Sequence, residues 1–293
     1  MVLMPVPAPV VVAAVGRSGS RTAIEYAVAE ATRRGCRLHL VHAFGSGVEP
    51  HPDLLAASLG HASALAHGRL DITGQLVAAD PLPAIAAIAQ HAELVVVGRR
   101  RDTRPAHPSV ARTVSGGLGG RVEAPVVTVP DDWSDEADVP TVLVGVDEPE
   151  RSRDVLATAL DAAQRRGARL VVLAAWWRPL GAERTPLTQV TDPARSARLR
   201  REVEAALEDL RPGADGVDVT VDIRRARPGE ALIEASREAS LLVLGRHATL
   251  VASGSHLGPV ARAVVREAAC PVLLAAPARH HWVSAAARVG ADR

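Results

Sequence analysis

The sequence predicts an α/β fold in which short parallel strands alternate with helices, and it predicts this unit twice along 293 residues. Composition is the first observation: 47% of the residues are hydrophobic but only 2% are aromatic, as in aliphatic strands buried between helices. The second is the alternation of β-rich runs with segments of helical periodicity. The third is an internal repeat, because the order of elements in the first half recurs in the second.

The elements expected in the first half follow one another at short intervals. They are a strand at 10–15, a helix at 21–34, a strand at 38–44, a helix at 84–91, a strand at 94–97 and a last strand at 126–129. Ala23, Ala27 and Ala31 give the first helix an apolar face at helical spacing. Gly35 follows at the position where a glycine commonly ends a helix.

The second half repeats this order of elements. Its strands are expected at 142–146, 170–176, 241–244 and 272–275, and its helices at 152–166, 193–210 and 230–239. The segment Arg34–Leu38 matches Arg166–Leu170 almost residue for residue. Strands joined in this way by helices predict a parallel sheet that is covered on both faces.

The repeat divides the chain into two expected domains. The predicted boundaries are 1–130 for the first domain, 131–139 for an acidic linker, 140–276 for the second domain and 277–293 for a flexible C-terminal tail. The tail has no hydrophobic periodicity, which is typical of a frayed terminus.

Charge and cysteine content exclude several classes of function. The 34 basic residues are all arginine and the 33 acidic residues are interspersed with them, so the net charge is only +1 and no large positive field attracts nucleic acid. Cys36 and Cys270 lie in different halves, which indicates buried thiols in a reducing compartment. No apolar run approaches the roughly 18 residues of a membrane helix, and no secretion signal is recognised. We therefore expect a cytoplasmic protein without membrane contact.

Two glycine-containing segments are the main candidates for a binding site. In the second half, Gly245 follows the strand at 241–244, and Gly258 opens the next helix. At such a place in an open α/β sheet, backbone N–H groups converge on a phosphate at a helix N-terminus. The first half has the same design around Gly98.

Over roughly 10–130 and 140–276, both halves resemble the domain of the universal stress protein (UspA) family, here in tandem. The resemblance implies a flavodoxin-like, Rossmann-like fold with five mainly parallel strands in each half and helices on both faces. It also implies a stress-response or regulatory protein, not an enzyme. In family members that bind ATP, an aspartate follows the first strand and contacts the nucleotide. A G-x2-G-x9-G-[S/T] motif follows the fourth strand, and its glycines and hydroxyl hold the phosphates.

The second half keeps the spacing of this motif but not all of its residue types. Asp147 stands at the aspartate, whereas Ala248 replaces the second glycine and Pro259 replaces the hydroxyl residue. A Cβ at Ala248 is unfavourable if φ is positive there, and Pro259 lacks both a hydroxyl and a backbone N–H. The candidate cofactor-binding residues of this half are Asp147, Gly245, Arg246, Ala248, Gly258, Pro259 and Val260. For Asp147, the alternative is an N-cap of the following helix.

The first half departs further from the family motif. Gly98 and Thr113 keep the first glycine and the hydroxyl, and both are candidate cofactor residues, but Arg101 and Arg112 replace the other two glycines. The arginines at 99–104 could neutralise a phosphate, but a solvated loop is the favoured interpretation. We expect Arg101 or Arg112 to fill the pocket.

These patterns lead to one functional hypothesis and two alternatives. We expect a cytoplasmic tandem universal stress protein that binds ATP or a related adenine nucleotide weakly and only in the second half, with Mg²⁺ only together with ATP. The first alternative is a nucleotide-independent scaffold for an unknown protein partner, with both pockets vestigial. The second is an ATP-hydrolysing enzyme, although the sequence offers no catalytic triad, no paired carboxylates and no lysine.

Two further expectations concern assembly and metal binding. The last strands of the two halves are rich in β-branched residues, and their pairing would protect two open edges. With the family resemblance, this favours an intramolecular pseudo-dimer, and a homodimer of two chains is possible. His51, His61 and His67 have no spacing that brings two of them to one helix face, so we expect surface residues instead of a metal site.

Overall fold

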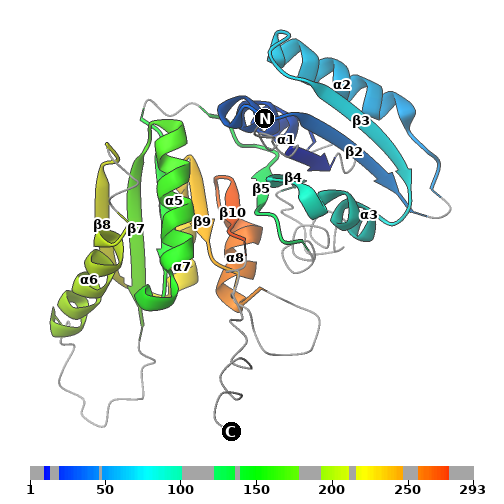
Figure 1. Ribbon diagram of the computed structural model, residues 1–293. Helices are drawn as coiled ribbons and strands as arrows, with labels where there is room; N and C mark the ends of the chain where they lie inside the picture. Colours follow the sequence, from blue (N-terminus) through cyan, green and yellow to red (C-terminus); the bar gives the residue numbers. More distant parts are fainter. Residues whose placement is uncertain are drawn as a thin grey trace, which may run out of the picture.

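The computed structural model contains one sheet with helices on both faces (Figure 1). It describes residues 10–13, 20–45, 48–100, 122–135, 139–177, 193–210, 216–246 and 257–276. Within these residues the sheet has ten strands. The predicted α/β fold with a mainly parallel sheet is therefore confirmed.

The strands follow the order β3-β2-β1-β4-β5-β10-β9-β6-β7-β8 across the sheet. Their bounds are Val10–Ala13 (β1), Leu38–Phe44 (β2), Ile72–Ala78 (β3), Leu94–Arg99 (β4), Val126–Pro130 (β5), Thr141–Val146 (β6), Arg169–Trp176 (β7), Val219–Arg225 (β8), Leu241–Leu244 (β9) and Val272–Leu274 (β10). Each half thus contributes five strands in the same order. All neighbouring strands are parallel except β5 and β10.

Helices pack on both faces of this sheet. The α-helices are α1 (Ser20–Arg34), α2 (Pro52–Ala66), α3 (Pro81–Ile88), α5 (Arg153–Arg166), α6 (Pro193–Glu208), α7 (Pro228–Ala235) and α8 (Pro259–Glu267). The 3₁₀ turns are η1 (Ala89–His91), η2 (Pro149–Arg151) and η4 (Ser236–Glu238). Buried residues of α1, α2, α5 and α6 form one hydrophobic core, and those of α3, α7 and α8 form the other.

Several helix boundaries differ from the sequence-based expectation. α3 and α7 begin at Pro81 and Pro228, before the expected starts at 84 and 230. Proline is well suited to the first helical position, because its fixed φ matches the helix and its missing N–H has no partner there anyway. The apolar periodicity gives no weight to such a residue, so the expected helices begin two or three residues too late.

The two halves meet where β5 pairs antiparallel with β10, in the middle of Figure 1. The register places Thr128 opposite Val272 and Val126 opposite Leu274. The pairing of the two last strands that the sequence predicted is therefore present. It makes one continuous sheet in which the backbone groups at the centre of each last strand have hydrogen-bonding partners.

A buried ion pair between α1 and α5 joins the halves at a second place. One oxygen of Glu30 lies 2.6 Å from Nη2 of Arg166, and the same nitrogen donates to the Tyr26 hydroxyl at 2.7 Å. The Glu30 side chain is 2% exposed and that of Arg166 is 7% exposed. Trp133, in the segment expected to be a linker, packs against the Tyr26 ring with 5.6 Å between ring centroids. This segment therefore contributes to the contact between the halves.

Three arginines determine the charge state of Glu30. Burial alone would raise the pKa of this carboxyl, but the charges of Arg166, Arg34 and Arg33 outweigh burial and hold the pKa below its usual value. Arg33 and Arg34 reach Glu30 from the next turn of α1, at 2.7 and 3.2 Å. Glu30 therefore stays ionised although it is buried.

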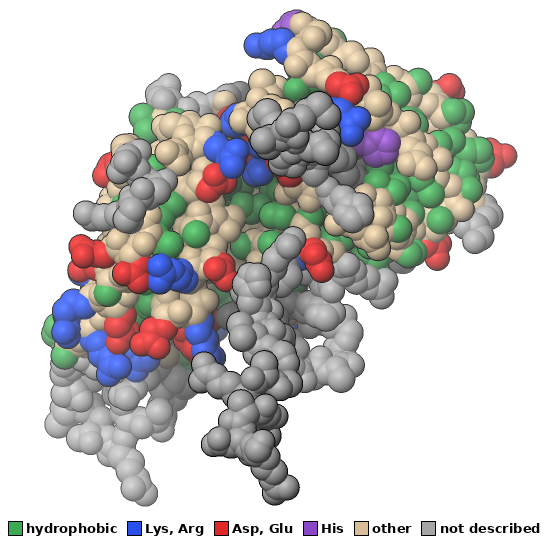
Figure 2. All heavy atoms as spheres, in the orientation of Figure 1, with side chains coloured by type: hydrophobic (Ala, Val, Ile, Leu, Met, Phe, Trp, Pro, Cys, Tyr) green, Lys and Arg blue, Asp and Glu red, His purple; other side chains and the backbone are tan. Residues whose placement is uncertain are grey.

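The exposed face of α6 carries charges of both signs. Arg198 pairs with Glu202 at 2.7 Å, and Arg200 lies 4.0 Å from Glu204. Figure 2 shows acidic and basic side chains interspersed over this part of the surface. This is a solvated face with paired charges, as the sequence indicates, and not a basic patch.

In the part of the chain that is described, no helix has the length and apolarity needed to cross a membrane.

Arg166→Met should lower the free energy of unfolding by about 3 kcal/mol, because it leaves the Glu30 carboxylate buried without its partner on α5. The matched control is Arg165→Met, since Arg165 is 40% exposed and forms its close ion pair with Asp161 on its own helix. That change should lower the free energy by less than about 0.5 kcal/mol. Urea denaturation measures both values, and equal losses would show that the α1–α5 ion pair does not stabilise the contact.

The stabilising effect of Glu30 should depend on pH. A carboxyl whose pKa is lower in the folded state than its ordinary value of 4.5 stabilises the fold above that value. This stability is lost as the pH falls through the folded pKa. The difference in unfolding free energy between the native chain and Glu30→Gln should therefore be constant near neutral pH and shrink below pH 4.5. Urea denaturation of both proteins from pH 7 to pH 3 measures this difference, and a difference that grows with acid would contradict the assignment.

Candidate functional site

A cavity of about 420 Å³ opens at the carboxyl ends of β6 and β9, within the size range of small-molecule sites. The helix that follows β6 packs on one face of the sheet, whereas the helix that follows β9 packs on the other. The cavity thus lies where the direction of the connections reverses, which is the usual ligand site of open α/β sheets. Six of the second-half candidates line it, namely Asp147, Gly245, Arg246, Gly258, Pro259 and Val260. Ala248 lies outside the described residues.

The walls of the cavity are largely apolar. They include Val155 of α5, Leu173 of β7, Leu232 of α7 and Leu244 of β9. The sequence pattern does not distinguish these residues from ordinary core positions. For Leu173 and Leu244, the available signal is their place at or near the carboxyl ends of their strands.

Glycine is required at the cavity because two elements approach closely. A Cβ on Gly245 would lie 2.8 Å from Cγ2 of Val155, and one on Gly145 would lie 2.7 Å from Cδ2 of Leu244. Gly245 is not among the described glycines with positive φ. The space between β9 and α5, and not a left-handed backbone, therefore excludes a side chain at Gly245.

The N-terminus of α8 supplies the backbone donors of the site. Gly258 takes the N-cap position and Pro259 the first helical position, so the helix forms with proline there, as expected. The N–H of Arg262 makes a bond to the Gly258 carbonyl at 3.0 Å. The amides of Val260 and Ala261 precede this bond and have no acceptor within the helix. Together with the helix dipole, they form a small anion-binding end.

Asp147 lies at the mouth of the cavity, and it does not cap the next helix. The residue at the N-cap of α5 is Ser152, and η2 separates it from Asp147. The N-cap interpretation of Asp147 is therefore wrong. One carboxylate oxygen of Asp147 accepts the backbone N–H of Glu148 at 2.7 Å, which orients the side chain at the end of β6.

Arg246 lines the cavity, but its guanidinium lies at the contact between the halves. Nε donates to the carbonyl of Ala275 at 2.6 Å and Nη1 to that of Val122 at 2.7 Å, while Nη2 donates to that of Ala124. Burial lowers the pKa of Arg246 to about 10, so the side chain stays charged at neutral pH. These contacts do not support the expectation that the Arg246 side chain binds the cofactor.

Of the two candidates in the first half, only Gly98 lies in the part of the chain that the structure describes. Gly98 is buried within β4, opposite Val129, and Thr113 lies outside the described residues. Arg99 was expected in a solvated loop, but it is the last residue of β4 and only 3% exposed. That expectation is wrong for Arg99, because its guanidinium donates to backbone carbonyls of the second half. Arg101, Arg104 and Arg112 also lie outside the described residues.

The three histidines considered as metal ligands lie within α2 or at its ends. His51 and His67 are exposed at its two ends, as expected. His61 is partly exposed, and its Nε2 lies 3.1 Å from a carboxylate oxygen of Glu25. Within the described ranges, no three His, Cys, Asp or Glu side chains are placed to hold a metal ion.

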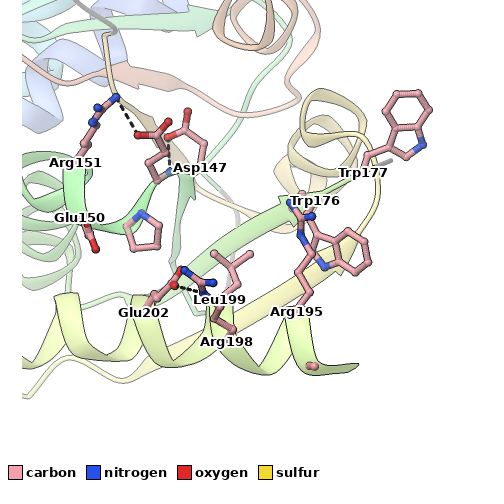
Figure 3. Close-up of a pocket in the computed structure, with 13 residues that line it drawn as sticks. Asp147, Glu150, Arg151, Trp176, Trp177, Arg195, Arg198, Leu199 and Glu202 are labelled. Carbon is pink, nitrogen blue, oxygen red and sulfur yellow. Dashed lines mark hydrogen bonds and ion pairs between the residues drawn. The ribbon is translucent and has the colours of Figure 1, made fainter. Parts of the chain in front are cut away.

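A second hollow, of about 870 Å³, adjoins the cavity between η2 and α6 (Figure 3). The two spaces share Asp147, Glu148, Arg151 and Ala175. Arg151 lies 3.0 Å from Glu148, and Figure 3 shows Arg198 paired with Glu202 on the opposite wall. This hollow was not expected from the sequence, although the Trp176–Trp177 pair at the end of β7 is a signal that could have indicated it.

Comparison with known proteins identifies the family. A family model described as "Universal stress protein family" matches residues 139–276. "Universal stress protein Rv2005c" from Mycobacterium tuberculosis is 30% identical over 230 residues, which cover 75% of this chain and 74% of that protein. This chain belongs to the universal stress protein family. The relative "Universal stress protein Rv2623" from the same species is 27% identical, over 87% of this chain and 92% of that protein.

A solved structure supports the fold over nearly the whole chain. The crystal structure of a universal stress protein from Archaeoglobus fulgidus DSM 4304 superposes with a TM-score of 0.66 at 16% identity. The superposition covers 91% of this chain and 97% of that one. The universal stress protein fold therefore extends beyond the range that the family model matches.

Gly245→Ala should lower the free energy of unfolding by about 1 to 3 kcal/mol, because the new methyl group overlaps Val155. In the double variant with Val155→Ala, the loss should be smaller than the sum of the two single losses, since removal of the Val155 methyls makes room. The control is Gly229→Ala, where a Cβ meets no atom within 4 Å. Chemical denaturation of the four variants tests this, and strict additivity would contradict the close approach.

Proposed function

We propose that this universal stress protein is a regulatory protein that binds an adenine nucleotide in the cavity of its second half. The observation that carries the proposal is the convergence of three kinds of group on one cavity. Apolar walls suit a planar base, the Asp147 carboxylate suits a ribose hydroxyl, and the amides at the start of α8 suit a phosphate. Family membership supports the same assignment.

The donor set favours weak binding. At the start of α8, Pro259 has no N–H and no hydroxyl, which leaves the amides of Val260 and Ala261 for the phosphates. The Arg246 guanidinium donates to carbonyls outside the cavity, and Arg151 lies beside Glu148. Among the described residues of the cavity, few charged donors are then available to hold a triphosphate. We propose that Mg²⁺ binds only together with ATP.

The proposal is of a binding protein without catalysis. The sequence has no lysine, a residue often used to stabilise phosphoryl transfer. Both cysteines are buried, and burial raises the pKa of the Cys270 thiol to about 12, so Cys270 is not a nucleophile at neutral pH. We propose a cytoplasmic protein of two tandem domains with the boundaries predicted from the sequence, joined as an intramolecular pseudo-dimer.

A second candidate is a nucleotide-independent scaffold that binds a protein partner. Its supporting observation is the use of Arg246, a cation beside the glycine motif, in the contact between the halves. In that case the cavity would be a remnant of the fold. One titration separates the two candidates.

Calorimetric titration and thermal denaturation with MgATP test the proposal. Millimolar MgATP should raise Tm, since ligand at ten times Kd stabilises the folded state by about 1.4 kcal/mol. Asp147→Ala should weaken binding about tenfold, as expected for the loss of a charged hydrogen-bond acceptor. Asp161→Ala, on the exposed face of α5, is the control and should bind like the native chain.

The alternatives predict other outcomes of this titration. If MgATP at millimolar concentration produced no binding heat and no shift in Tm, this result would contradict nucleotide binding and favour the scaffold. Phosphate release above background, removed by Asp147→Ala, would favour an ATP-hydrolysing enzyme.

A further inference from the structure

Two arginines occupy equivalent positions in the two halves. Arg99 follows Gly98 at the end of β4, and Arg246 follows Gly245 at the end of β9. β4 and β9 are the strands next to β5 and β10 in the sheet. Each arginine reaches across the paired strands β5 and β10 and donates to backbone carbonyls of the other half. The exchange of contacts is reciprocal.

The acceptors show what each arginine holds. Arg246 reaches the carbonyls of Val122 and Ala124, just before β5, and also that of Ala275 in its own half. Arg99 donates to the carbonyls of Arg266 and Ala268 at 2.6 Å each, at the C-terminal end of α8. Helix C-termini present carbonyls and the negative end of the dipole, so a cation is favourable there. The planar guanidinium fork fixes direction as well as distance, which a lysine does not.

Their positions relative to the cavity differ. Arg246 directly follows Gly245 in the sequence, and the close approach of Gly245 to Val155 forms one wall of the cavity. Arg99 acts on the far end of α8, whereas residues at the start of that helix line the cavity. Nine residues of helix separate the two ends by about 13 Å. The contacts are therefore alike in chemistry but unlike in their distance from the site.

We propose that Arg246 is a positioning residue: by binding the carbonyls of Val122 and Ala124, it uses the first half to hold Gly245 at the wall of the second half's cavity. The inference rests on the proposed function only in taking an adenine nucleotide as the ligand. The role of Arg246 in holding Gly245 in place does not depend on which ligand binds. It gives the first half a role although its own motif is degraded. The first half acts as the support on which the binding site of the second half is built.

The test compares Arg246→Met with Arg99→Met in the full chain. Each variant removes one guanidinium from the same contact, so both should lower Tm, by about 5 °C. Arg246→Met alone should accelerate amide hydrogen exchange across 244–246, about tenfold, and weaken MgATP binding about tenfold. Arg99→Met should leave both quantities within about twofold of the native chain. The difference between the variants separates positioning from general stability.

Arg246→Lys keeps the charge without the fork, and it serves as the second variant if Arg246→Met does not fold. If both variants fold, the proposal is supported by an amide exchange rate at 244–246 in Arg246→Lys that lies between those of the native chain and Arg246→Met. If only Arg246→Lys folds, an exchange rate above that of the native chain supports the proposal. Equal effects of the Arg99 and Arg246 variants on exchange, or native exchange in Arg246→Lys and Arg246→Met, overturn it. If the native chain binds no MgATP, the proposed function fails, but hydrogen exchange in the ligand-free protein still decides the role of Arg246.

Discussion

The antiparallel pairing of β5 with β10 is the contact on which the rest of the structure depends. It joins two five-stranded sheets into one, and the other interactions between the halves lie on either side of it. Toward one face, Glu30 of α1 forms a buried ion pair with Arg166 of α5. At the strand ends, Arg99 and Arg246 donate to carbonyls of the opposite half. Backbone pairing sets the alignment, and charged groups then fix it, because buried charges tolerate little displacement of their partners.

The two halves share a fold but differ in what their chemistry offers. The second half keeps an aspartate at the end of β6, two glycines and a helix N-terminus around one cavity. The first half has arginine where two of the motif glycines would stand, and its Gly98 is buried in a strand. Yet the first half supplies Glu30 and Arg99 to the contact between the halves. This asymmetry is consistent with one half that binds a ligand and one that supports it.

Much of the fold could be predicted from the sequence, because hydrophobic periodicity and glycine positions are local signals. β2 and β9 have the expected bounds, and Gly35 and Gly167 follow α1 and α5 with φ of 61° and 58°. The candidates around Gly245 and Gly258 also converge on one cavity. The roles of Arg99 and Arg246 could not be predicted. Their partners in the opposite half lie more than 120 residues away in the chain. In the sequence, an arginine beside a glycine motif is equally consistent with a phosphate ligand.

The site contains two kinds of residue, and only one of them is informative about the ligand. Packing accounts for Gly245, since a Cβ there would overlap the β-branched side chain of Val155. This reason for glycine holds with an empty cavity too. Capping does not account for Asp147, which is exposed at the end of β6 while Ser152 takes the N-cap position of α5. Its carboxylate, oriented by the N–H of Glu148 beside an apolar cavity, can accept a hydrogen bond from a hydroxyl-bearing ligand. Asp147, more than the glycine motif, is therefore the residue on which the assignment of a nucleotide depends.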